Sequence, residues 1–336
     1  MQFEFQPQGE GFLSARDAET LARKNWERVA ENLGLDQSLF TSKIIRSRIN
    51  EGSPRIVMRI DGPDHPQFVF KMGLNPSKAD VLKHEVAAQK YATGLFLNDD
   101  KFHVPEIIHV DEVNQILLME HVEGLTAHDN LLLGKSSEGR ANVLCQCGQW
   151  IGKLHERSKI RENIVNPNAV IKHLRSMKEK VDTGVVRVAG RKKYLSYVPK
   201  AIEMAETARG KITTLATAHG DMNLRNIVLG PKGVSVFDFN DTKILPIGHD
   251  LARFFVAFGN FFFPNGSKST DWFETDLNSF FEGYGPQHRF DPSFTYLMGV
   301  QILNDWAKIP KKKEMRNNLH VRRWAGLQTL AQLVFE

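Results

Sequence analysis

The sequence has little cysteine, no long apolar run and no strong excess of charge of either sign, and each shortage excludes a class of protein. Only Cys145 and Cys147 occur. Two positions apart on a helix, their side chains would diverge by about 200°, which suits neither a disulfide nor a metal site, so we expect core residues. No stretch approaches the ~20 apolar residues of a membrane span, and the first residues lack the basic and apolar segments of a secretion signal. We therefore expect a soluble, cytoplasmic protein without a membrane partner.

The excess of positive charge is too small to indicate nucleic acid binding. The chain has 44 lysine and arginine residues against 39 aspartate and glutamate residues, a formal charge of +5. The densest run, Lys311–Lys313, directly follows Pro310 and is typical of a solvated loop. With 336 residues the chain can form two domains or one two-lobed domain. The sequence does not indicate an oligomeric state.

One polar segment, residues 219–226, carries the residue types that phosphoryl transfer needs. An attacking hydroxyl needs a carboxylate that orients it and accepts its proton, whereas ATP-bound Mg²⁺ needs separate oxygen ligands. Asp221 suits the first task, and Asn226 offers an amide oxygen to the metal. Asp238 follows a hairpin predicted from the turn at residues 230–233, which would return its carboxylate to the side of Asn226.

These linked elements resemble the aminoglycoside phosphotransferase and choline kinase group, relatives of protein kinases that carry HGDxxxxN where protein kinases carry HRDxxxxN. The resemblance implies that Asp221 is the catalytic base and that Asn226 and Asp238 bind Mg²⁺. Asp250, in a segment similar to the family's D-L-A motif, is implied to be structural and to open a helix. An HGD triplet alone is a weak signal, because short polar loops often form turns, but three elements in the right order are far more specific.

The first part of the chain predicts a small β-rich lobe. We expect a helix from Ser14 to Gly34, antiparallel strands over residues 43–49, 55–60 and 67–72, and a helix over residues 81–91. Lys71 at the end of a strand and Glu85 on the helix resemble the kinase pair in which the lysine reaches the α- and β-phosphates. The alternative is an unrelated surface lysine and surface glutamate, and the downstream motifs favour the pair.

The turn between the first two strands is the candidate phosphate-covering loop. It contains Gly52 but not the GxGxxG of protein kinases. We expect Asn50, Gly52 and Ser53 to face the nucleotide phosphates with backbone N–H groups. An ordinary type I turn fits these residues equally well.

A strand over residues 115–123 resembles the family's hinge. The backbone of Glu120, His121 and Val122 would hydrogen-bond the adenine edge. Because side chains do not read the base in such a hinge, both ATP and GTP are compatible with the sequence.

The rest of the chain predicts a larger, mostly helical lobe. His155 is expected to cap a helix rather than to act in catalysis. Helices within residues 160–212 would wall the acceptor pocket, as the resemblance implies. Helical patterns cover residues 142–155, two or more helices within 160–212 with a loop at 186–192, a buried helix over 254–263, and helices over 272–282, 293–306 and 315–335.

The sequence therefore predicts an α+β, two-lobed, protein-kinase-like fold divided into residues 1–120 and 121–336. Its predicted function is Mg²⁺-dependent transfer of the γ-phosphate of ATP, or GTP, to a hydroxyl of a small molecule such as an amino-alcohol, a sugar or an aminoglycoside. A catalytically inactive nucleotide-binding module is the alternative from another class. A protein kinase is less favoured because no APE-like segment follows the catalytic motifs.

Overall fold

The chain divides into two units in the computed structural model, which describes residues 14–49, 54–63, 66–75, 79–134, 136–240, 242–263 and 271–336. The first unit comprises Met1–Gly94 and Val104–Glu123. The second comprises Leu95–His103 and Gly124–Glu336.

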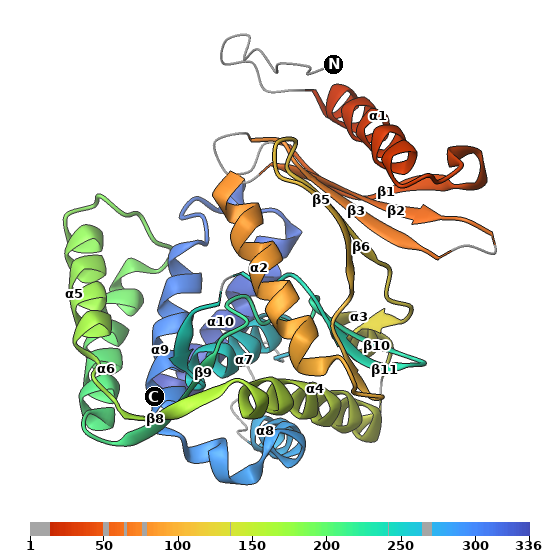
Figure 1. The fold of residues 1–336 in the computed structure, drawn as a ribbon. Coiled ribbons are helices and arrows are strands. Elements are labelled where there is room, and N and C mark those ends of the chain that lie inside the picture. The colour runs from red at the N-terminus through yellow and green to blue at the C-terminus, as the bar shows by residue number, and fades with distance from the viewer. Residues whose placement is uncertain are drawn as a thin grey trace. The chain divides into compact units, whose positions relative to one another are not determined.

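The first unit is built on one antiparallel sheet with strand order β1-β2-β3-β6-β5 (Figure 1). Its predicted strands and helices are confirmed, with α1 beginning at an N-cap in which the Ser14 side chain accepts from the Asp17 N–H. The elements are α1 (Ala15–Asn32), η1 (Gln37–Leu39), β1 (Thr41–Arg48), β2 (Arg55–Asp61), β3 (Phe68–Gly73), α2 (Ala79–Phe96), β5 (Ile107–Asp111) and β6 (Ile116–Glu120).

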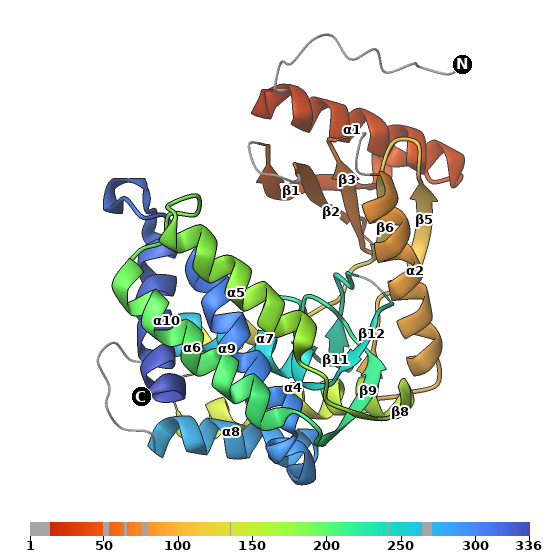
Figure 2. The same ribbon diagram turned by 90° about the vertical axis from the view of Figure 1, so that its left-hand side faces the viewer.

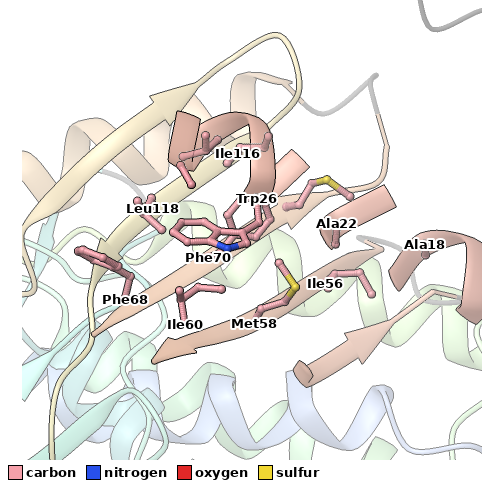
Figure 3. Packing of buried hydrophobic residues seen from close by; sticks show 13 residues of the cluster. Ala18, Ala22, Trp26, Ile56, Met58, Ile60, Phe68, Phe70, Ile116 and Leu118 are labelled. Atoms are coloured by element: carbon pink, nitrogen blue, oxygen red, sulfur yellow. The ribbon is translucent and has the colours of Figure 1, made fainter. Parts of the chain in front are cut away.

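One face of this sheet forms an apolar core against α1 (Figure 3). Trp26 of α1 packs edge-on against Phe70, with ring centroids 6.4 Å apart. Ala18 and Ala22 are fully buried, and their small side chains let the helix lie close to the strands. Removing a large buried aromatic side chain typically costs about 3–5 kcal/mol. Since successive strand residues alternate, Lys71 lies on the opposite face from Phe70.

The second unit is mostly helical, with two small sheets of order β4-β11-β10-β7 and β12-β9-β8 (Figures 1 and 2). Its strands are β4 (Phe102–His103), β7 (Leu125–Thr126), β8 (Lys159–Ile164), β9 (Ile212–Thr217), β10 (Ile227–Gly230), β11 (Gly233–Val236) and β12 (Ile244–Pro246). Its helices are α3 (Ala127–Leu133), α4 (Ser137–Arg157), α5 (Asn168–Asp182), α6 (Arg191–Ala208), α7 (Gly248–Phe262), α8 (Asp271–Tyr284), η3 (Pro286–Phe290), α9 (Pro292–Ala307), η4 (Lys313–Met315) and α10 (Asn318–Phe335).

Strand β8 is the main departure from the predicted elements. We predicted only helices and a loop between residues 160 and 212, and α5 and α6 confirm the helices. β8 precedes them and pairs antiparallel with β9. Every residue of β8 is exposed, so the strand has no buried face and therefore no apolar alternation that a sequence pattern could show.

The predicted buried segments are largely confirmed. Phe254, Phe255 and Phe258 on α7 are fully buried. Cys147 is also fully buried, but Cys145 is only partly so, and neither forms a disulfide. Within the described residues, no helix is both long enough and apolar enough to span a bilayer.

Candidate active site

Residues 219–226 form a loop that is anchored by a buried histidine. His219 is fully buried, and burial lowers the pKa of its imidazole, which is therefore neutral at pH 7. Its Nδ1 accepts from the Asp221 N–H at 3.2 Å, so the proton is assigned to Nε2, which donates to the Phe237 carbonyl at 3.0 Å. His219 thus links the start of the loop to the end of β11.

Asp250, in the first turn of α7, holds the same loop by its backbone. Its fully buried carboxylate accepts from the His219 N–H at 2.7 Å and from the Gly220 N–H at 3.0 Å. Burial alone would raise the pKa of this carboxyl, but the hydrogen bond with His155 and the neighbouring imidazoles hold that pKa well below its usual range. Asp250 is therefore an anion that fixes the loop.

His155 extends this network away from the loop. Burial raises the pKa of the Tyr284 hydroxyl, so the hydroxyl keeps its proton and donates to Nδ1 of His155 at 2.7 Å. Nε2 of His155 then donates to Asp250 at 3.2 Å. We predicted from the sequence that His155 caps its helix. Instead, its ring hydrogen-bonds Tyr284 and Asp250, and so it supports the carboxylate of Asp250. The reason is tertiary, because its two partners come from α7 and α8.

Asp221 itself is accessible and oriented. Its side chain is 47% exposed and forms an ion pair with Arg253. Arg253 lies three positions after Asp250 on α7, so one helix face holds both the backbone and the side chain of the HGD segment. The hydrogen bond between Asp221 and Asn226 uses the Asp221 backbone carbonyl and not its carboxylate.

Asn226 is suitably oriented to present an oxygen to a metal. The side chain is 6% exposed, and its Nδ2 donates to the Asp221 carbonyl at 3.0 Å. Its Oδ1 therefore points away from that carbonyl and is available as a ligand. The amide orientation is assigned from this hydrogen bond.

The predicted hairpin is present and brings Asp238 to the neighbourhood of Asn226. β10 and β11 pair with Ile227 opposite Val236, and the Phe237 N–H donates to the Asn226 carbonyl at 3.1 Å. Asp238 follows with φ of 64°, a left-handed conformation that a non-glycine residue adopts at a cost of about 1 kcal/mol or more. Among the described residues, no three or more His, Cys, Asp or Glu side chains form a group that could hold a metal ion. Asn226 and Asp238 are one amide and one carboxylate, so they do not make up a group of that kind.

The first unit supplies the predicted lysine–glutamate pair. Lys71 of β3 and Glu85 of α2 form an ion pair, and their side chains are only 9% and 16% exposed. The predicted partners therefore meet, in a partly desolvated setting where the attraction is stronger than at an open surface. Their role toward a nucleotide stays a prediction.

Two of the three N–H groups in the predicted hinge are used within the first unit. The Glu120 N–H donates to the Glu106 carbonyl at 2.9 Å, and the His121 N–H donates to the Gln67 carbonyl at 2.9 Å. No hydrogen bond joins the Val122 N–H to another described residue. That any of these three residues binds a base stays a prediction.

The candidate phosphate-covering residues lie outside the described residues. They are Asn50, Gly52 and Ser53.

The model of the phosphotransferase enzyme family (APH) matches residues 48–290. The chain belongs to this family. No curated protein is detectably similar to it in sequence.

Several solved structures share the fold. A streptomycin–ATP–APH(2")-IIa ternary complex is 12% identical, with 93% of this chain and 98% of that chain covered and a TM-score of 0.53. A glucosamine kinase in complex with glucosamine, ADP and inorganic phosphate is 15% identical, with coverage of 88% and 82% and a TM-score of 0.57. A choline/ethanolamine kinase family protein from Mesorhizobium loti is 14% identical, with coverage of 91% and 94% and a TM-score of 0.56. The predicted α+β, kinase-like fold is confirmed.

Two residues of the candidate site in this phosphotransferase were not predicted from the sequence. Arg253 contacts Asp221, and Tyr284 contacts His155. A signal for Arg253 existed, because it stands one turn after Asp250 and so shares a helix face with it. Tyr284 gave no local signal, since its partner is 129 positions away.

A cavity of about 580 Å³ lies in the second unit of this phosphotransferase, beside His155 and Tyr284. His155, Tyr284 and Lys153 line it. Asp221, Asn226 and Asp238 do not, so the cavity is separate from the candidate catalytic residues.

Proposed function

We propose that this phosphotransferase moves the γ-phosphate of ATP to a hydroxyl of a small molecule in an Mg²⁺-dependent reaction. The observation that carries the proposal is that two different side chains of the loop at residues 219–226 suit the two tasks of base and metal ligand. Asp221 presents an accessible carboxylate held by Arg253, whereas Asn226 donates through Nδ2 to the Asp221 backbone carbonyl, so that its Oδ1 points away from that carbonyl. A base and a metal ligand are thus delivered by one short loop, as phosphoryl transfer requires.

In the proposed reaction, Asp221 orients the acceptor hydroxyl and takes its proton as the oxygen forms a bond to the γ-phosphorus. The bond from that phosphorus to the β–γ bridging oxygen breaks, and ADP leaves. Asn226 and Asp238 would hold the Mg²⁺, which when bound neutralises phosphate charge. Lys71, oriented by Glu85, would reach the α- and β-phosphates.

The names of similar structures support a small acceptor. They include proteins bound to streptomycin and to glucosamine, and a choline/ethanolamine kinase family member. We therefore propose an amino-alcohol, sugar or aminoglycoside-like acceptor, with GTP as a possible replacement for ATP. Because the phosphate donor is an intracellular nucleotide, we also propose that the protein acts in the cytoplasm.

The deciding experiment measures ADP formation against a panel of aminoglycosides, amino-alcohols, choline-like amines and sugars. With an acceptor that wild type uses, Asp221→Asn should bind Mg·ATP almost normally and transfer phosphate at least ~100-fold more slowly, because only the base is lost. Asp100→Asn is the matched control, since this exposed carboxylate also belongs to the second unit and lies outside residues 160–212, whose helices the resemblance places at the acceptor pocket. Its activity should equal that of wild type.

Two results would contradict the proposal. One is the absence of acceptor-dependent ADP formation across the panel, which would favour a catalytically inactive nucleotide-binding module. The other is an Asp221→Asn variant that keeps full activity with its best acceptor.

A further inference from the structure

Arg55 opens β2 on the same sheet face as Lys71. In the antiparallel register Arg55 lies opposite Gly73 and Val57 lies opposite Lys71, so Arg55 and Lys71 are diagonal neighbours on adjacent strands. The residue between Arg55 and Val57, Ile56, belongs to the core against α1, where Figure 3 shows it pointing with Phe70. The side chain of Arg55 therefore points away from that core.

Arg55 also shares a cavity with the predicted phosphate-binding pair. A pocket of about 80 Å³ in the first unit is lined by Arg55, Lys71 and Glu85, with Leu82 and Leu117 as apolar walls. Two cations and one carboxylate thus face one small space, which leaves an excess of positive charge in it. Such a space favours an anion.

The guanidinium of Arg55 has no partner within the described part of the chain. Its Nε is buried and makes no hydrogen bond, and no ion pair joins it to another described residue. By contrast, Arg59, two positions beyond Val57 on the same face, is paired with Asp61 at 2.6 Å. A partly buried guanidinium without a partner is costly, and a charge-assisted hydrogen bond to a bound anion removes that cost.

We propose that Arg55 binds a phosphate of the nucleotide, as a second cation beside Lys71. This inference rests on the proposed function, because it needs a nucleotide in the site. The sequence between Ile49 and Pro54 contains a single glycine, whereas protein kinases carry a glycine-rich GxGxxG stretch there that covers the phosphates. In this protein the side chain of Arg55 would instead neutralise part of the phosphate charge. Its planar fork of N–H donors matches two phosphate oxygens at once.

Titration calorimetry on the full chain with Mg²⁺ tests this, with ATP, ADP and adenosine as probes. For Arg55→Ala the Kd for ATP should rise roughly 10- to 100-fold, the usual effect of losing one hydrogen bond to a charged group. The Kd for adenosine, which has no phosphate, should stay within about twofold of wild type. Arg55→Lys should recover part of the loss, since it restores the charge but not the fork. Comparison of ATP with ADP shows whether the γ-phosphate is the one bound.

Arg28→Ala is the matched control. Arg28 lies on α1, on the other side of the sheet, and pairs with Asp111 at 2.6 Å, so this variant removes one positive charge from the same unit without touching the pocket. It should bind ATP like wild type. Arg55→Gln, which keeps a long polar side chain, is measured as well in case Arg55→Ala does not fold.

The outcomes separate the two proposals. Suppose that wild type binds ATP and that Arg55→Ala and Arg55→Gln both keep the wild-type ratio of ATP affinity to adenosine affinity. The proposed role of Arg55 is then wrong, and the proposed function stands. If wild type binds neither ATP nor ADP with Mg²⁺, the proposed function fails, and the role of Arg55 fails with it.

Discussion

Two side chains of α7 determine the geometry around the candidate base. Asp250 accepts hydrogen bonds from the backbone of His219 and Gly220, and Arg253 holds the carboxylate of Asp221. Since Asp250 is charged and fully buried, breaking one of its hydrogen bonds leaves a costly unsatisfied group. The loop is thereby held in place before any substrate arrives, which is what a positioned base requires.

Asp238 is expected to make nucleotide binding depend on Mg²⁺. Asp238→Asn removes the charge, and asparagine tolerates the left-handed backbone at this position. The Mg²⁺ concentration needed for half-maximal ATP binding should rise at least about tenfold, because a neutral amide is a weaker ligand than a carboxylate. Calorimetry at a series of Mg²⁺ concentrations measures it. An unchanged Mg²⁺ requirement would show that Asp238 is not a ligand, and Asp100→Asn serves as the unaffected reference.

At the scale of elements, the close approach of α4 and α8 places Tyr284 against His155. The approach depends on glycines, since a Cβ at Gly148 would lie 2.1 Å from the Phe280 carbonyl oxygen, and one at Gly283 would lie 2.0 Å from the Cys145 carbonyl oxygen. The helix backbones therefore touch directly. A wider spacing would withdraw the Tyr284 hydroxyl from His155 and loosen the support of Asp250.

Gly148→Ala should lower the free energy of unfolding of the second unit by about 1–3 kcal/mol, because the methyl group must push the two helices apart. Gly94→Ala, in α2, is the reference, since nothing lies within 4 Å of the added methyl group. Alanine there favours the helix by up to about 1 kcal/mol. Denaturant titration followed by circular dichroism compares the two. Equal stability of Gly148→Ala and wild type would mean that the helices do not approach as closely as described.

For the molecule as a whole, buried and half-buried histidines set how stability depends on pH. Burial lowers the pKa of His219 from its ordinary 6.5, and burial lowers the pKa of His121, His128 and His288 in the same direction. Between the folded pKa and 6.5 the unfolded chain binds protons that the folded chain does not. The contribution of these histidines to the free energy of unfolding is therefore complete above pH 6.5 and is lost as the pH falls below that value. The Asp250 carboxyl acts later, since its lowered pKa matters only below its ordinary 3.8.

The urea concentration at the midpoint of denaturation should therefore decrease when the pH is lowered from about 7.5 to about 5.5. In this window histidines titrate and carboxylates hardly do. His219→Gln should be less stable overall but lose less over this window, because one buried titrating group is gone. His84→Gln, at an exposed position on α2, should keep the wild-type slope. Identical slopes for His219→Gln and wild type would show that His219 is not held neutral by the fold.

The sequence by itself determined the features that depend on short segments: the HGDxxxxN loop, the hairpin that returns Asp238, the Lys71 strand and most helices. Each follows from local turn chemistry or from apolar periodicity, which a few neighbouring residues suffice to express. Only the tertiary structure decided the role of His155, the pairing of Asp221 with Arg253 and the position of Arg55 without a partner. The partners concerned lie 32 positions apart for Asp221 and Arg253 and 129 for His155 and Tyr284. No local pattern encodes such contacts, because they arise where packed helices bring distant side chains together.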